Sequence, residues 1–178
     1  MDRIKNKTRT TTAILLAHNL LAFFAAQFGW KMFFGDISAA FLQGENLDPK
    51  RVVYVAIPKG YSSFVQEYLK TLLPPHARTD VVQFIKGGFG LAESPRLWFK
   101  KLQRTVKKLG AHEWALIPGV FSLFQEGRVD AMLACHVDDI RMVGHPVDAQ
   151  HIWDKLKQEF TFGEWRDARD DWVKFCGR

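Results

Sequence analysis

The pattern of apolar and polar positions predicts both helices and strands along most of the chain. An apolar run over residues 13–28 predicts a helix that stops before a glycine. The clearest helical pattern has Ser94 as the expected N-cap, Pro95 in the first turn and Gly110 just past the end. Apolar residues at helical spacing predict a last helix over about residues 148–160.

Short β-branched and aromatic runs between these segments predict strands. We expect them at residues 31–37, 52–57, 81–85, 121–124, 131–135 and 140–143, and in the tail at residues 170–176. Residues 62–80, which contain Pro74-Pro75, are expected to form an irregular connection. Because short turns separate several strands and helices do not alternate strictly with them, we predict an α+β fold with an antiparallel sheet packed on helices.

Composition narrows the class of protein. With 178 residues and 47% apolar residues, the chain is expected to form one domain, and a disordered or collagen-like protein is excluded. Two cysteines, Cys135 and Cys176, are too few for a disulfide scaffold and fit a reducing compartment. The longest unbroken apolar run near the N-terminus, Leu20–Ala26, is far shorter than the ~20 residues of a membrane span.

The charge is unevenly distributed. The formal net charge of the chain is +6, and residues 81–110 alone carry an excess of +6 from seven basic residues against Glu93. Residues 111–150 carry −4, from two basic and six acidic residues. On charge alone an ordinary solvated helix face explains the basic segment most simply, and the alternative is a surface that binds a polyanion.

An acidic pair interrupts an apolar stretch near the middle of the acidic segment. Asp138 and Asp139 are bracketed by Val137 and Ile140 rather than by Gly, Asn or Pro. A simple hairpin turn is one interpretation, because Asp tolerates turn geometry. The other is that a divalent cation lies between the pair and a third carboxylate, for which Asp36 at the end of its own apolar strand is the candidate. Such a set would hold two metal ions roughly 3.5–4 Å apart, which would together stabilise the charge of an in-line phosphoryl transfer.

Four blocks of sequence carry a family resemblance. They are Gly35–Gly44 (GDISAAFLQG), Tyr54–Tyr61 (YVAIPKGY), Gly88–Phe99 (GFGLAESPRLWF) and His136–Ile140 (HVDDI). In the same order they resemble the motifs D-V-x-x-A-F-L-x-G, I-Y-M-x-x-P-x-G-F, L-Y-G-L-K-Q-A/S-P-R-x-W and Y-V-D-D-I of the reverse transcriptase of copia-type retrotransposons. The resemblance implies an RNA-directed DNA polymerase that transfers a nucleotide from a dNTP to a primer 3′-OH.

The resemblance also implies roles for individual residues. Asp36, Asp138 and Asp139 would be the catalytic palm carboxylates and, with the Ile37 carbonyl, would bind two Mg²⁺ ions, or Mn²⁺ in their place. The nucleotide site would comprise Ala39, Ala40, Phe41, Phe89 and Gly90. Phe41 would lie under the sugar and exclude a ribose 2′-OH, although a core phenylalanine is the ordinary alternative.

The implied partners are an RNA or DNA template-primer and dNTPs, together with the rest of a Pol polyprotein if the chain is a fragment. The nucleic acid would contact Lys86, Ser94, Pro95, Arg96, Lys100, Lys101 and Arg104. We expect residues 1–178 to form a single palm and partial-fingers domain, truncated at both ends, without thumb, RNase H or integrase. The expected location is intracellular, in the cytoplasm (in a virus-like particle) or the nucleus, without secretion or membrane contact.

The chain also departs from the family pattern. His136 stands where the family has Tyr, and Ala92-Glu93 stand where it has Lys-Gln. These departures keep open a second interpretation, a catalytically inactive element remnant that only binds nucleic acid. A metal-dependent nuclease is a third, which the absence of an evident water-activating base disfavours.

Overall fold

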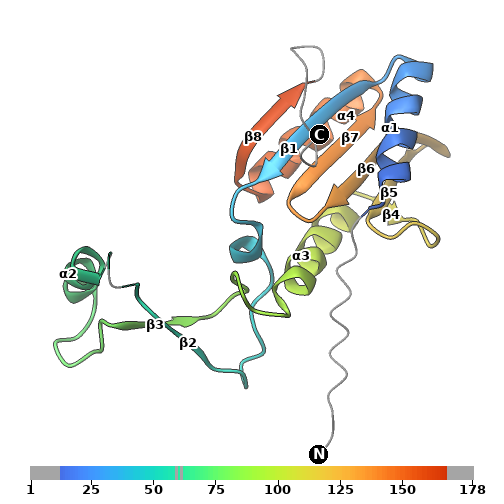
Figure 1. Ribbon diagram of the computed structural model, residues 1–178. Helices are drawn as coiled ribbons and strands as arrows, with labels where there is room; N and C mark the ends of the chain where they lie inside the picture. The colour runs from blue at the N-terminus through green and yellow to red at the C-terminus, as the bar shows by residue number, and fades with distance from the viewer. Residues whose placement is uncertain (1–12, 59, 61, 168–178) are drawn as a thin grey trace, which may run out of the picture.

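A six-stranded antiparallel sheet forms the centre of the structure, a computed structural model that describes residues 13–58, 60 and 62–167 (Figure 1). Across the sheet the strands are β4 (Ala111–Glu113), β5 (Val120–Gln125), β6 (Arg128–His136), β7 (Asp139–Gly144), β1 (Lys31–Ile37) and β8 (Phe162–Asp167). Every neighbouring pair is antiparallel. The predicted α+β class with an antiparallel sheet is therefore confirmed.

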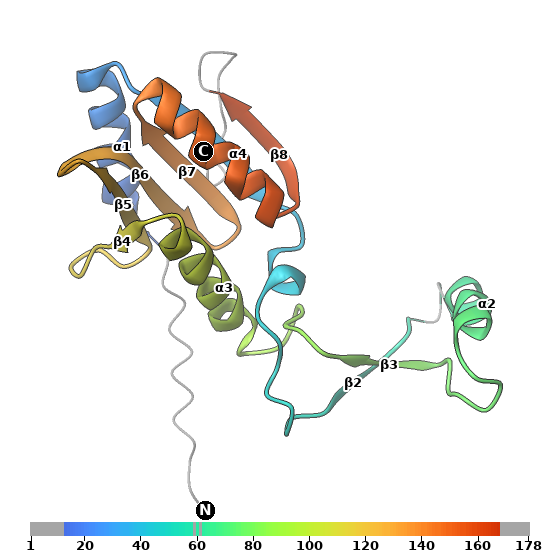
Figure 2. The same ribbon diagram turned by 180° about the vertical axis from the view of Figure 1, so that it is seen from behind.

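Helices cover both faces of this sheet. Helix α1 (Leu15–Phe28) lies on one face, and α3 (Ser94–Lys108) and α4 (Pro146–Glu159) pack on the other. Figures 1 and 2 show α1 and α4 on opposite sides of the strands. Because successive side chains of a strand point to opposite faces, the strands β1, β5, β6 and β7 supply residues to the core on both faces.

The larger core lies between the sheet and the helices α3 and α4. Trp98 from α3 and Trp153 from α4 are almost completely buried in it. Gly35 in β1 leaves the space for this packing, since a Cβ there would come within 2.4 Å of the Phe162 ring and 2.9 Å of the Trp153 ring. Any side chain at position 35 would force these aromatic residues away from β1.

A second, smaller unit extends away from the sheet (Figures 1 and 2). It follows the 3₁₀ turn η1 (Ala40–Gln43) and comprises the hairpin of β2 (Val53–Ala56) and β3 (Val81–Phe84) with helix α2 (Ser62–Leu72). The expectation that residues 62–80 are irregular was wrong for the part that α2 occupies. Phe64, Tyr68 and Leu72 recur every four residues, which is helical spacing, and all three are exposed.

Other boundaries also differ from the expectations. Ser94 is the first residue of α3 rather than its N-cap, which is Glu93, because the Ser94 hydroxyl bonds to the backbone of Gly88 instead. Strands β4 and β8 were not predicted. The strand expected at residues 170–176 lies outside the described residues. Within the described part of the chain, no helix has both the length and the apolarity needed to cross a bilayer.

Candidate active site

Three carboxylates lie in a row at one end of the sheet. Asp36 in β1 is paired with Asp139 in β7 on one side and with Glu164 in β8 on the other. Directly opposed residues of antiparallel strands place their side chains on the same face. Met32, which shares the face of Asp36 in β1, packs in the core under α1. The row therefore lies on the α1 face, opposite the larger core.

Asp138 lies beside this row, in the turn between β6 and β7. The backbone N–H of Ile37 donates a hydrogen bond of 2.9 Å to the Asp138 carbonyl, so the turn is joined directly to the end of β1. The side chain of Asp138 is exposed and that of Asp139 is half-buried. The structure thus brings Asp36, Asp138 and Asp139 to one place, although about a hundred residues separate the first from the pair.

The turn that carries Asp138 has an unusual backbone. It is a two-residue loop, Val137-Asp138, between the paired residues His136 and Asp139. Val137 has φ +57°, a left-handed conformation that glycine adopts freely and that a β-branched residue adopts only under constraint. Such strained residues are concentrated at functional sites, where the surrounding structure holds them in place.

The like charges act on Asp36. Burial raises the pKa of the Asp36 carboxyl above its usual range, and the negative charges of Asp138, Asp139 and Glu164 raise it further. Hard oxygen ligands of this kind suit a divalent cation. Nevertheless, within residues 13–58, 60 and 62–167 no group of three or more His, Cys, Asp or Glu side chains is arranged to hold a metal ion.

Two residues beside Asp36 carry no signal in the sequence. Gly163 lies against its carboxylate, since a Cβ at position 163 would come within 2.9 Å of Asp36 Oδ2. Glu164 adds the next negative charge on β8. Neither residue belongs to a block that resembles the family motifs, and only the pairing of β8 with β1 brings them to the site.

The positively charged side chain of Arg141 lies on the same face of the sheet as the acidic row, two residues along β7 from Asp139. Arg141 in β7 is paired with Phe34 in β1, and its guanidinium lies 4.8 Å from the centre of the Phe34 ring. Arg141 Nη1 donates to the His18 carbonyl of α1 at 2.8 Å. His136 also lies toward α1, with Nδ1 3.4 Å from the Ala13 carbonyl. His136, which stands where the family has Tyr, therefore contacts the backbone just before the start of α1.

The residues expected to bind the nucleotide fall into two groups. The Phe41 ring in η1 is 5.3 Å from the Phe89 ring in an edge-to-face arrangement, and Phe89 is 76% exposed. Ala39 is exposed, whereas Ala40 is buried in the larger core. Gly90 has φ +87°, which glycine adopts without strain. The structure thus joins the first and third motif blocks through Phe41 and Phe89.

The residues expected to contact nucleic acid differ in their exposure to solvent and in whether an acidic side chain already pairs with them. Arg96 and Lys100 are exposed on α3 and have no acidic partner within the described residues. Lys101 and Arg104 are paired with Glu159 at 3.5 Å and Glu45 at 3.0 Å. Of the remaining three, Lys86 and Pro95 are half-buried and Ser94 is completely buried.

The second departure, at Ala92-Glu93, is compensated locally. The Glu93 carboxylate lies 2.6 Å from Arg51 Nη1, so its added negative charge is paired rather than left beside the Phe41 and Phe89 rings. Both residues are partly exposed, and such a pair contributes little to stability. The departure therefore alters the local charge less than the sequence suggests.

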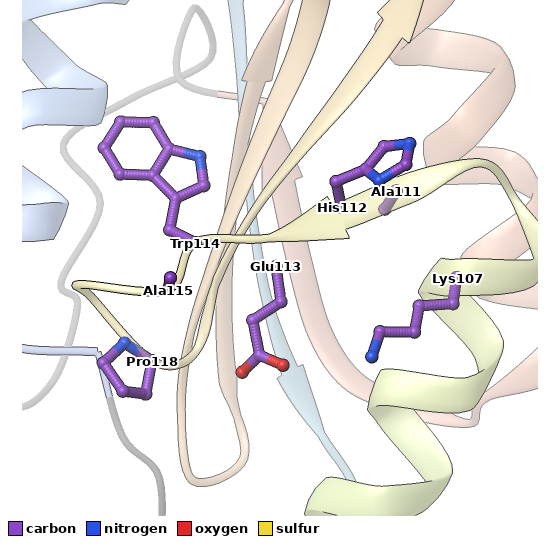
Figure 3. Close-up of a pocket in the computed structure, with 7 residues that line it drawn as sticks. All are labelled: Lys107, Ala111, His112, Glu113, Trp114, Ala115 and Pro118. Atoms are coloured by element: carbon purple, nitrogen blue, oxygen red, sulfur yellow. The ribbon is translucent and has the colours of Figure 1, made fainter.

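A separate groove of about 690 Å³ opens at the opposite edge of the sheet, beside β4. Figure 3 shows the side chains of Lys107 and Glu113 extending toward the same space from α3 and β4. The Glu113 carboxylate already accepts hydrogen bonds from the side chain of Gln103 and the backbone of Gly119. None of the predicted site residues lines this groove.

Comparisons with known proteins agree with the motif blocks. The protein family described as "Reverse transcriptase (RNA-dependent DNA polymerase)" matches residues 7–170. The chain is 31% identical over 134 residues to a retrovirus-related Pol polyprotein from transposon RE2 of Arabidopsis thaliana, covering 74% of this chain and 8% of the relative. It is 32% identical over 131 residues to a putative transposon Ty5-1 protein of Saccharomyces cerevisiae, covering 71% of this chain and 35% of the relative.

A solved structure of telomerase from Candida albicans, in complex with a TWJ fragment of telomeric RNA, is also similar. It has a TM-score of 0.45 and 10% sequence identity, and the alignment covers 98% of this chain and 34% of the telomerase chain. The chain thus spans about a third or less of each of these known proteins.

The raised pKa of Asp36 makes a prediction about stability. A carboxyl that holds its proton more tightly in the folded state destabilises the fold as pH rises above about 3.9, the value for an unfolded Asp. Asp36→Asn removes this charge, so we expect a higher melting temperature than wild type at pH 7. The difference should shrink as pH is lowered toward 4. Thermal unfolding between pH 4 and 7 measures it, and a lower melting temperature of Asp36→Asn at pH 7 would contradict it.

Proposed function

Because this chain belongs to the reverse transcriptase (RNA-dependent DNA polymerase) family, we propose that it is the palm and partial-fingers part of a copia-type retrotransposon Pol polyprotein. The proposed reaction is attack of a primer 3′-OH on the α-phosphate of a dNTP. The observation that carries this proposal is the convergence of the first and fourth motif blocks, through the pairing of Asp36 with Asp139.

The side chains near Asp36 offer the carboxylate oxygens that divalent ions prefer, although within the described residues they are not arranged as a metal site. Asp36, Asp138 and Asp139 would hold them, with the Ile37 carbonyl as a further oxygen ligand. Burial and, after it, the neighbouring negative charges raise the pKa of Asp36, and bound cations would relieve the repulsion among these charges. Bound Mg²⁺ would supply charge stabilisation in the transition state and lower the pKa of the attacking hydroxyl.

The chain's own residues would orient the substrates. Phe41 and Phe89, whose rings are in contact, would form the wall beside the sugar and base of the incoming nucleotide. The exposed residues Arg96 and Lys100 would contact phosphates of the template-primer, a contact independent of sequence. Lys101 and Arg104 would contribute after exchanging their acidic partners for phosphate.

Substitution of Asp138 tests the catalytic proposal. Asp138→Asn keeps the size of the side chain and removes a charge that would help to hold the metal ions, so we expect extension of a primed RNA template with Mg²⁺ and dNTPs to fall by at least about 100-fold. The matched control is Asp154→Asn, a surface position on α4 whose carboxylate is paired with Lys157. Equal extension by the wild type and Asp138→Asn would remove the catalytic claim.

Selectivity for deoxynucleotides tests the role of Phe41. Phe41→Val shortens the side chain that would lie under the sugar, so we expect the preference for dNTP over rNTP, measured as a ratio of kcat/KM, to fall at least about 10-fold. Phe124→Val, at a half-exposed position in β5, is the control for loss of a phenyl ring. An unchanged ratio with a lower melting temperature would assign Phe41 to the core alone.

Salt dependence tests the basic surface of α3 whether or not the chain is active. The double variant Arg96→Gln/Lys100→Gln should reduce the slope of log affinity for RNA against log salt by about 2, because each lost phosphate contact removes roughly one counterion. Lys157→Gln, paired with Asp154 on α4, should leave the slope unchanged.

An unchanged slope in the double variant would identify this surface as an ordinary solvated face. Salt-sensitive RNA binding without metal-dependent extension would instead favour the second candidate function, an inactive remnant that only binds nucleic acid. The departures at Ala92, Glu93 and His136 are the observations on which that candidate rests.

A further inference from the structure

A buried tryptophan reaches the turn that carries Asp138. Trp98 in α3 is 1% exposed, and its indole Nε1 donates a hydrogen bond of 2.5 Å to the carbonyl of Val137. The side chain approaches from the larger core, on the face of the sheet opposite the acidic row. The contact therefore passes from the interior of the protein to the backbone of the candidate active site.

This contact falls on the residue whose backbone is strained. Val137 has φ +57° at a loop position where a two-residue hairpin favours glycine. A non-glycine residue in this region costs of order 1–3 kcal/mol and persists only when its surroundings hold it. The Val137 carbonyl is held by Trp98, with Cys135 Sγ at 3.2 Å, and the next carbonyl, of Asp138, is held by the N–H of Ile37.

We propose that Trp98 is a positioning residue for the reaction, and that its indole N–H holds the Val137-Asp138 turn so that the Asp138 carboxylate stays beside Asp36. This inference rests on the proposed function. Without the indole donor, the partly buried Val137 carbonyl would keep only the weak thiol donor of Cys135, and the strained turn would be free to relax. Asp138 would then leave its position next to the acidic row.

The protein contains a matched control for this role. Trp153 in α4 is equally buried and packs in the same core. Within the described residues, however, its indole Nε1 has no hydrogen-bond partner. Trp98→Phe and Trp153→Phe therefore remove the same atoms from the same core, and only the first removes a hydrogen bond to the turn.

The first measurement is the affinity of the full chain for Mn²⁺ alone, followed by electron paramagnetic resonance. We expect Trp98→Phe to weaken Mn²⁺ binding about 10-fold, the effect of losing the stronger of the two donors to the Val137 carbonyl. Trp153→Phe should change it less than about 2-fold, although both variants should lower the melting temperature. In primer extension, Trp98→Phe should lower kcat with little change in KM for dNTP. Equal effects of the two variants on Mn²⁺ affinity would overturn the proposal.

The same substitution of Trp98, made in a Val137→Gly variant, tests whether the hydrogen bond acts through the strained turn. Val137→Gly removes the conformational strain, because glycine adopts a positive φ freely. In this background the effect of Trp98→Phe on Mn²⁺ affinity should shrink to less than about 3-fold. An undiminished effect would show that Trp98 acts on the metal-binding residues by another route, and the proposal would fail.

Nuclear magnetic resonance of the unsubstituted chain keeps the inference testable if Trp98→Phe does not fold. The Trp98 indole N–H should exchange with solvent much more slowly than that of the half-exposed Trp165, and it should shift on addition of Mg²⁺ more than the Trp153 indole N–H. Fast exchange of the Trp98 N–H, or no shift while the signals of Asp138 move, would overturn the proposal. Failure of the unsubstituted chain to bind either ion would count against the proposed function, while the exchange rate would still decide whether the hydrogen bond exists.

Discussion

The pairing of β1 with β7 is the constraint on which the rest of this structure depends. It places Asp36 directly opposite Asp139, and the pairing of β1 with β8 adds Glu164 to the same row. Like charges opposed across a sheet repel, so the row is stable only because the strands are held by other interactions. The structure supplies these from the opposite face, where Phe33, Ile37 and Ile140 of the same two strands are buried under α3 and α4.

This division between two faces explains how one strand serves both stability and the proposed chemistry. In β1 the side chains of Phe33 and Ile37 pack into the larger core, and Gly35 makes room for two aromatic rings there. Asp36 lies between them on the other face, where burial and neighbouring charges raise its pKa. The Val137-Asp138 turn is also held from the core, since the indole of the buried Trp98 donates a hydrogen bond to the strained backbone of Val137.

Local patterns predicted most of the elements but not all of them. The apolar runs identified β1 with its correct ends, and the stop of α1 at Gly29 followed from the backbone freedom of glycine. Helix α2 was missed because Pro74-Pro75 suggested an irregular segment, although Phe64, Tyr68 and Leu72 recur at helical spacing. Ser94 was misplaced as an N-cap because the backbone of Gly88, six residues earlier, bonds to its hydroxyl instead.

The sequence by itself determined the family, the acidic residues of the candidate site and the basic surface of α3, because short motifs and charge runs are local properties of the chain. Only the tertiary structure decided which residues surround those acids. Gly163 and Glu164 reach Asp36 through the pairing of β8, and Trp98 reaches Val137 across the core. Contacts of this kind join residues far apart in the chain. They depend on strand register and on the packing of buried side chains, which no local pattern records.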